Sequence, residues 1–303
     1  MSGVDGLAER FEAHRERLNS LAYRMLGSPG ESEDAVQEAW LRLARTDPGT
    51  VDNLGGWLTT VVSRVCLDLL RSRAARHEDL IAAHQIEDRI DLGRDADPER
   101  EAVLVDDVGR ALLVVLDRLA PAERIAFVLH DMFAVPFAEI APVLDRTTAT
   151  TKKLASRARL KVRGTPAVPA PDLARHRRVV QAFLAASRAG DVEAIVAVLD
   201  PDVVRLADRT AIPAGRPAEA RGAGRVAEEI VVFGAMARFA QVALVDGAAG
   251  IVVAPHGRLR SAVAVTIAGD RIVRYELIAD PARLRDLDLA VLDGPPSGGT
   301  GSS

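Results

Sequence analysis

A proline-rich segment, residues 164–171, divides the chain into two parts with different hydrophobic periodicities. Before this segment, apolar residues recur every three or four positions, which is the spacing of amphipathic helices. After residue 200, short runs rich in valine, isoleucine and leucine are separated by glycine-containing turns, which is typical of strands and hairpins. The sequence therefore predicts an all-helical N-terminal part and a C-terminal α+β domain with a curved antiparallel sheet.

The composition is that of a globular protein with enough apolar residues for several cores, since 48% of the 303 residues are hydrophobic. No uninterrupted apolar run approaches the ~18 residues of a membrane-spanning helix, and charges occur throughout the N-terminal segment. We therefore expect a cytoplasmic protein that does not use a membrane. The single cysteine, Cys66, excludes an internal disulfide, and the six scattered histidines lack metal-ligand spacing, so neither a metal nor a cofactor is expected.

Charge is distributed unevenly along the chain, although the formal net charge is only −4. Residues 146–163 contain seven basic side chains and no acidic one, whereas residues 78–107 contain three basic and eleven acidic ones. The basic block is typical of a nucleic-acid contact. The acidic segment has three interpretations: it enters a basic channel of a partner, it folds back on the basic helix and masks it, or it is a solvated spacer.

Residues 136–163 carry the most specific local pattern, that of a helix-turn-helix. A short helix is predicted from Pro136 to Leu144, Asp145 occupies the turn, and a second helix begins near Thr148. The outward face of the second helix carries hydroxyls and cations that suit the major groove of duplex DNA: Thr148, Lys152, Lys153, Ser156, Arg157 and Arg159. The alternative is an ordinary helical hairpin with a solvated basic face.

Longer stretches on both sides of the acidic segment resemble the extracytoplasmic-function (ECF) sigma factors of bacterial RNA polymerase. The resemblance is carried by residues 21–28 (LAYRMLGS), 34–43 (DAVQEAWLRL), 56–61 (GWLTTV), 66–71 (CLDLLR), 119–129 (LAPAERIAFVL), 137–141 (FAEIA) and 154–159 (LASRAR). It implies that residues 7–77 form sigma region 2, a helical bundle, and that residues 108–163 form sigma region 4. The acidic residues 78–107 would be the linker between the two regions.

The C-terminal part resembles the SnoaL-like cone that one subgroup of these sigma factors carries, through residues 182–195 (AFLAASRAGDVEAI), 199–203 (LDPDV) and 279–284 (ADPARL). The resemblance places this domain at 173–290, after a proline-rich linker at 164–172 and before a disordered tail at 291–303. It also implies that the domain regulates the sigma factor in cis, at the high effective concentration of a covalent attachment. A small apolar ligand inside the cone is left open, although no residue pattern points to one.

The resemblance further implies two partners, core RNA polymerase and promoter DNA. Region 4 would read the −35 element as duplex through the six helix residues given above. Region 2 would hold unstacked bases of the −10 element with Asn53, Trp57, Thr59, Thr60, Ser63, Arg64 and Arg71. Core polymerase would bind the helix at 33–45 through Asp34, Gln37, Glu38 and Trp40. The alternatives are a solvated polar face for the −10 residues and ordinary packing for Trp40.

The chain is not predicted to be an enzyme, because it contains no glycine-rich phosphate loop, zinc-protease motif or nucleophile elbow. Asp208, His256 and Glu276 are the candidates for a catalytic acid or base in the cone, and each is expected at the surface near a strand end or turn. Two other functions stay open: a helix-turn-helix regulator that needs no polymerase, and a cyclase- or isomerase-like enzyme with a DNA-binding appendage.

Overall fold

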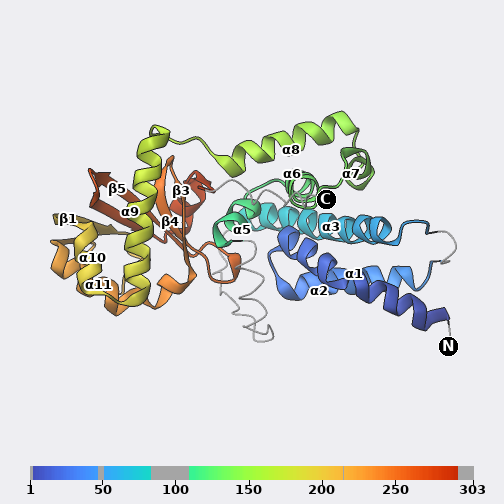
Figure 1. The fold of residues 1–303 in the computed structure, drawn as a ribbon, viewed down its shortest axis with the longest axis horizontal. Coiled ribbons are helices and arrows are strands. Elements are labelled where there is room, and N and C mark those ends of the chain that lie inside the picture. The colour runs from blue at the N-terminus through green and yellow to red at the C-terminus, as the bar shows by residue number, and fades with distance from the viewer. Residues whose placement is uncertain (1–2, 47–50, 83–108, 214, 293–303) are drawn as a thin grey trace, which may run out of the picture. The chain divides into compact units, whose positions relative to one another are not determined.

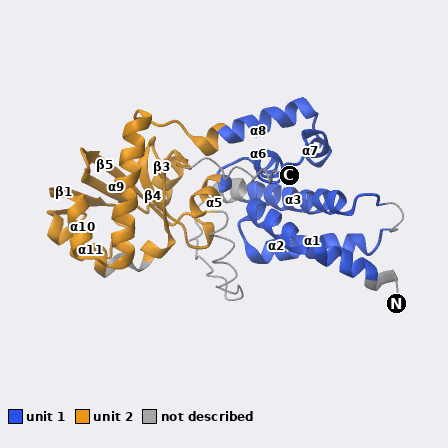
Figure 2. Cartoon of the chain, in the orientation of Figure 1, with its two compact units in different colours: residues 1–108, 116–159, 295–303 blue, residues 109–115, 160–294 orange. Residues whose placement is uncertain are grey.

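The computed structural model describes residues 3–46, 51–82, 109–213 and 215–292, which form two compact units (Figure 2). Unit 1 comprises Met1–Val108, Leu116–Arg159 and Pro295–Ser303, and unit 2 comprises Gly109–Val115 and Leu160–Gly294. The division falls inside two helices. The start of one helix and the end of another therefore belong to the unit that contains the C-terminal sheet.

Unit 1 is all-helical in the part of it that the structure describes, as the periodicity predicts (Figure 1). Three helices precede the acidic segment: α1 (Gly3–Leu26), α2 (Pro29–Leu43) and α3 (Leu54–Ala82). The helices after it are the end of α5 (Arg110–Asp117), α6 (Pro121–Phe127), the π-helical η2 (Val128–Met132), α7 (Phe137–Leu144) and most of α8 (Thr148–Arg163). Figure 1 shows α3 with α1 and α2 along one side and α6 and α7 along the other, and all four helices contact it.

Helix α2 begins at Pro29, four residues before the predicted start, because Ser28 and not Ser32 is its N-cap. The Ser28 hydroxyl accepts a hydrogen bond from the Glu31 N–H, and proline fits the first turn because it lacks the N–H that would stay unpaired there. Ser32 is buried, and its hydroxyl donates to the Ser28 carbonyl at 2.6 Å. Both serines are residues that commonly cap a helix. Ser28 is the cap because it directly precedes Pro29, the first residue of the helix.

Helix α3 is longer at both ends than the predicted helix at 57–73. The Asn53 side-chain oxygen accepts from the Gly56 N–H at 3.0 Å, which caps the helix and moves its start back to Leu54. At the other end the helix continues to Ala82, so residues 78–82 belong to it and not to a linker. The rest of the predicted acidic linker lies outside the described residues.

The helix-turn-helix prediction is confirmed. Asp145 lies in the left-handed region, with φ 56° and ψ 48°, between the end of α7 and the start of α8 at Thr148. The backbone N–H of Asp145 donates to the Ala141 carbonyl, which closes the turn. Helix α7 continues through Pro142 to Leu144.

Unit 2 contains a seven-stranded sheet with helices packed against it (Figure 1). The strands are β1 (Leu199–Ala207), β2 (Glu219–Arg221), β3 (Ala240–Val245), β4 (Ala248–Val253), β5 (Ser261–Ala268), β6 (Arg271–Ile278) and β7 (Leu289–Ala290). The helices are α9 (Ala170–Ala189), α10 (Val192–Val198), α11 (Ala223–Phe233) and α12 (Pro281–Asp286), with short 3-10 helices η3 (Gly234–Phe239) and η4 (Pro255–Gly257). The α+β prediction is confirmed.

The strands lie in the order β2-β1-β6-β5-β4-β3-β7. Every neighbouring pair is antiparallel except β1 and β6, which are parallel because α11 and the β3–β5 meander separate them in sequence. Asp246 and Gly247 in the turn between β3 and β4, and His256 and Gly257 in the 3-10 turn after β4, all have positive φ. The core between helices and sheet contains Val180, Phe183 and Ile195 from the helices, and Ile251 and Tyr275 from the strands.

Among the helices that the structure describes, none combines the length and the apolar composition needed to cross a membrane.

Candidate nucleic-acid and polymerase interfaces

Helix α8 presents the predicted −35 residues on its outer face. Thr151, Ala155 and Ala158 are fully buried at steps of three and four residues, so the helix packs inward along that stripe. On the outer face, five of the six predicted residues are exposed: Thr148, Lys152, Lys153, Ser156 and Arg157. Helix α8 contains no acidic residue, so this face combines positive charge with hydroxyl groups that can form hydrogen bonds.

Arg159 differs from the other five because its guanidinium forms an ion pair with a carboxylate of another helix. Its Nε donates to the Asp131 carboxylate in η2 at 2.5 Å, and its side chain is 32% exposed. An arginine held by a carboxylate must break that pair before it contacts a phosphate. We therefore assign Arg159 a structural contact within residues 116–159, and the predicted DNA contact would require a rearrangement.

The predicted −10 residues on α3 are less accessible than the sequence suggests. Thr59 is 8% exposed and Ser63 fully buried, and their hydroxyls donate to the carbonyls of Gly55 and of Thr59, four residues earlier in the same helix. These two side chains do not line a surface that is open to a DNA strand. Their role at the −10 element stays a prediction, and in this conformation the face of α3 on which they lie is packed.

The other −10 residues lie around this packed face. Trp57 and Thr60 are half-buried, whereas Asn53, Arg64 and Arg71 are exposed. Asn53 caps α3, as described above, and the Arg64 guanidinium donates to the Pro142 carbonyl of α7 at 3.2 Å. Arg71 lies 3.9 Å from Asp68 of the same helix, so Arg64 is the one of these five residues that has a hydrogen bond or ion pair with another helix among the described residues.

The predicted polymerase-binding residues occupy the outer side of α2. Asp34 and Gln37 are exposed, and half-buried Glu38 pairs with Arg42 one turn later at 2.8 Å. Trp40 is half-buried, and its ring packs on Phe11 of α1 with the centroids 5.1 Å apart. The α2 surface therefore offers carboxylates and an amide, and Trp40 also holds α2 on α1.

Sequence reasoning did not predict that Arg124 of α6 is a buried cation. Its side chain is 2% exposed, and it donates to the Asp117 carboxylate at 3.1 Å and to the Arg24 carbonyl of α1 at 3.4 Å. Burial lowers the pKa of this guanidinium, and the neighbouring Asp117 opposes the shift. Cys66 lies close to Arg124, and burial raises the pKa of its thiol to about 12. Nothing in the local sequence distinguishes Arg124 from the exposed arginines.

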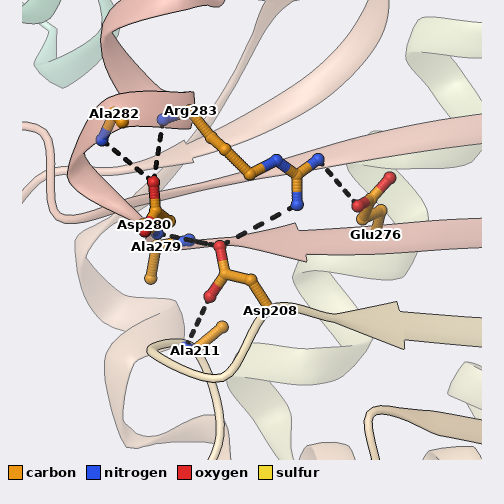
Figure 3. Close-up of polar contacts among 7 residues, drawn as sticks. All are labelled: Asp208, Ala211, Glu276, Ala279, Asp280, Ala282 and Arg283. Atoms are coloured by element: carbon orange, nitrogen blue, oxygen red, sulfur yellow. Dashed lines mark hydrogen bonds and ion pairs between the residues drawn. The ribbon is translucent and has the colours of Figure 1, made fainter.

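The three candidate catalytic residues of unit 2 do not form a site. The Asp208 carboxylate accepts backbone hydrogen bonds from Ala211, Ala279 and Asp280 at 2.7–2.8 Å, and Arg283 lies 4.0 Å away (Figure 3). Burial opposes ionisation of Asp208, but these donors outweigh it, so its pKa lies below the ordinary value.

Neither Glu276 nor His256 forms a catalytic acid–base pair with Asp208. Glu276 pairs with Arg283 at 2.8 Å (Figure 3). His256 is exposed and lies in the 3-10 turn after β4. The Asp208 carboxylate therefore joins the loop after β1 to the loop after β6 through hydrogen bonds, which is a structural role. Its side chain is also less exposed than the sequence predicted. No group of three or more potential metal ligands occurs among the described residues.

A buried ion pair occupies the packed side of the sheet in unit 2. Arg205 is 3% exposed and donates to Glu229 of α11 at 2.7 Å and to the Pro217 carbonyl at 3.0 Å. Tyr275 is buried beside it, and burial raises the pKa of its phenol.

Unit 2 also contains the first residues of α5. The Gln241 side-chain oxygen on β3 accepts from the Ala111 N–H at 2.8 Å, which satisfies a donor that the helix itself leaves unpaired. Gly109, with φ +79°, precedes this helix, and a Cβ atom there would stand 3.2 Å from the Gln241 amide. Leu113 packs against Gly257, where a Cβ atom would stand 2.9 Å from it. The sheet domain therefore holds the start of α5.

Comparison with known proteins assigns both helical regions. Residues 10–76 match the family model "Sigma-70 region 2", and residues 109–162 match "Sigma-70, region 4". The probable ECF RNA polymerase sigma factor SigI of Mycobacterium tuberculosis is 35% identical over 291 residues, which cover 95% of this chain and 98% of the relative. The ECF RNA polymerase sigma factor SigJ of the same bacterium is 43% identical over 252 residues, with 79% of this chain and 78% of the relative covered.

Two solved structures are also similar. The crystal structure of Mycobacterium tuberculosis SigJ is 33% identical and covers 96% of this chain and 99% of its own, with a TM-score of 0.45. The sigma factor RpoE of Bartonella quintana, solved with the anti-sigma factor NepR, is 18% identical and covers 51% of this chain and 92% of its own, with a TM-score of 0.36.

Proposed function

Since the chain belongs to the ECF RNA polymerase sigma factors, we propose that it directs core polymerase to promoters by reading the −35 element with α8 and the −10 element with α3. The outer face of α8 carries this proposal. Its exposed cations, Lys152, Lys153 and Arg157, grip phosphates, and the exposed hydroxyls of Thr148 and Ser156 would hydrogen-bond base edges in the major groove.

Core polymerase binds region 2 through α2 in this proposal. Asp34 and Gln37 are the exposed groups that contact the polymerase, and the Glu38–Arg42 pair lies next to them. Trp40 orients this surface through its packing on Phe11 and is a positioning residue. The site of action is then the cytoplasm, where core polymerase and the chromosome are found.

We further propose that the C-terminal domain regulates region 4 in cis. The support is the cap that Gln241 provides for α5, together with the contact between Leu113 and Gly257. A covalently attached domain acts at high effective concentration, so a few such contacts suffice to hold a helix. A ligand of the C-terminal domain would act by changing this contact.

Run-off transcription tests the sigma function. The template carries the DNA upstream of the chain's own gene, and core polymerase of Mycobacterium tuberculosis is used with and without the protein. We expect transcripts with one start site only when the protein is present, and their loss when Lys152, Lys153 and Arg157 are replaced by alanine. Arg178, an exposed arginine on α9, is the matched control, since Arg178→Ala removes a cation from another helix. No core binding and no transcript on several templates would reject the proposal.

A further inference from the structure

The cations of α8 differ in how free they are to reach a phosphate. Lys152 and Arg159 are seven residues apart, or about two helical turns, so they lie along one edge of the outer face. Lys153 and Arg157 are four residues apart and lie on the rest of this face. Lys152, Lys153 and Arg157 are all exposed, whereas the Arg159 side chain is 32% exposed. Arg159 is therefore the least accessible of these four cations.

The group that holds Arg159 is the carboxylate of Asp131 in η2. Arg159 Nε donates to Asp131 Oδ1 at 2.5 Å, and the Asp131 side chain is 16% exposed. The other carboxylate oxygen, Oδ2, is buried and accepts no hydrogen bond from the described residues. Among these residues, Arg159 is the one cation that forms an ion pair with Asp131. The carboxylate and the guanidinium thus neutralise each other.

The position of Asp131 does not depend on Arg159 alone, because η2 is tied to the chain that follows it. His130 Nδ1 lies 3.0 Å from the Val135 carbonyl oxygen, within hydrogen-bond distance. The His130 ring also stacks on Phe137 at the start of α7, with the centroids 3.7 Å apart. The Asp131 carboxylate is therefore a fixed acceptor, and a shorter side chain at this position should leave η2 in place.

A guanidinium binds a phosphate with the same donors that it offers to a carboxylate. Arginine presents these donors in a planar fork that suits either anion. Arg159 lies on the same edge of α8 as Lys152, the edge that would face one phosphate strand of the major groove. Because the Asp131 pair occupies Nε, a contact with this strand would first require the loss of an ion pair inside the protein.

We propose that Asp131 limits the sequence-independent affinity of α8 for DNA by holding Arg159 away from the phosphate backbone. This inference rests on the proposed function for the role of α8 in binding duplex DNA. A phosphate contact adds affinity for any sequence, whereas contacts to base edges distinguish the promoter from other DNA. A chromosome offers a large excess of sites without the promoter sequence. Asp131 thus weakens binding to such sites and leaves the residues that read bases unchanged.

The salt dependence of DNA binding tests this inference. Fluorescence anisotropy measures the affinity of the full-length protein for two duplexes of equal length, the DNA upstream of its own gene and a random sequence. Asp131→Ala frees Arg159, so the slope of log affinity against log salt should become steeper by about 0.9 on both duplexes. The ratio of variant to wild-type affinity should then be about 3.5-fold larger at ~50 mM salt than at ~200 mM. An unchanged slope overturns the inference.

A double-mutant cycle shows whether Arg159 carries the effect. Arg159→Ala alone should leave the slope unchanged, because the held guanidinium touches no phosphate. Asp131→Ala should then add nothing in the Arg159→Ala background. If Asp131→Ala steepens the slope equally with and without Arg159, the loss of a negative charge explains the effect, and the inference is overturned. It is also overturned if Arg159→Ala alone lowers the slope by about 0.9, since Arg159 would then already contact DNA.

Glu139 of α7 provides the matched control. It is exposed, and among the described residues no cation of α8 pairs with it. Glu139→Ala removes a carboxylate from region 4 without freeing a cation, so its slope should equal that of the wild type. A steeper slope of the same size in this variant overturns the inference. Asp131→Asn keeps the shape of the side chain without its charge, and it replaces Asp131→Ala in the cycle if circular dichroism shows the alanine variant to be unfolded.

The variants with alanine at Lys152 and Lys153 separate this inference from the proposed function. If these variants lower the slope while the Asp131 cycle shows no change, binding of DNA by α8 stands and the inference is rejected. If neither set of variants changes the slope, α8 does not contact DNA, and both the −35 part of the proposed function and the inference are rejected.

Discussion

Replacing Asp208 by asparagine removes the charge that joins the loops after β1 and β6. The carboxylate accepts three backbone N–H groups at 2.7–2.8 Å, and its side chain is 12% exposed. A hydrogen bond to a charged group contributes roughly 1.5–3 kcal/mol. Asparagine keeps one oxygen but turns an N–H₂ group toward the remaining donors. We therefore expect Asp208→Asn to lower the free energy of unfolding by about 3 kcal/mol at pH 7.

The effect should depend on pH in a direction fixed by the pKa of Asp208. This pKa is lower in the folded state than the unfolded value of ~3.9. A group with a depressed folded pKa stabilises the protein fully above its unfolded pKa, and this stability is lost as the pH falls through the folded pKa. Asparagine does not titrate. The difference between the two proteins should therefore be full near pH 7 and shrink below pH ~4.

Thermal unfolding followed by circular dichroism measures this difference. A loss of about 3 kcal/mol should lower Tm by roughly 6–12 °C at pH 7. Asp202→Asn is the control, because Asp202 is exposed on the same strand and its carboxylate has no hydrogen bond or ion pair among the described residues. The reasoning is refuted if Asp208→Asn and Asp202→Asn melt alike at pH 7, or if the Asp208→Asn deficit grows as the pH falls.

Three further changes test other parts of the molecule. Gln241→Ala removes the acceptor for the Ala111 N–H, and we expect about fivefold faster amide exchange at the start of α5, for a cap of ~1 kcal/mol; mass spectrometry that finds unchanged exchange contradicts the cap. Replacing Lys152 and Lys153 by alanine should reduce the slope of log affinity against log salt by about 2 for duplex promoter DNA, and an unchanged slope in fluorescence anisotropy shows that they touch no phosphate. Gly247 has a φ of +77°, and a Cβ atom there would stand 2.9 Å from the Ala167 backbone nitrogen before α9. Gly247→Ala should therefore lower the urea midpoint by the equivalent of ~2 kcal/mol, and an unchanged midpoint would exclude strain at this turn.

The sequence predicted those parts of the fold that depend on local pattern. The left-handed Asp145 and the turn at Asp246 follow from residue type and position, and both have positive φ. Strands β2 and β7 were missed because three and two residues are too few to show an alternation. The parallel pairing of β1 with β6 depends on contacts across about 70 positions of the chain, which no local window contains.

The same dependence on local pattern explains which candidate site residues the sequence correctly placed at the surface and which it did not. The inner stripe of α8 is apolar and its outer face is charged, so hydrophobic periodicity alone indicates which residues are exposed. Thr59 and Ser63 gave no such signal, because a hydroxyl in a helix is satisfied either by solvent or by the carbonyl four residues earlier. Arg124 is charged, and only the three-dimensional structure shows the carbonyl and carboxylate that allow its burial.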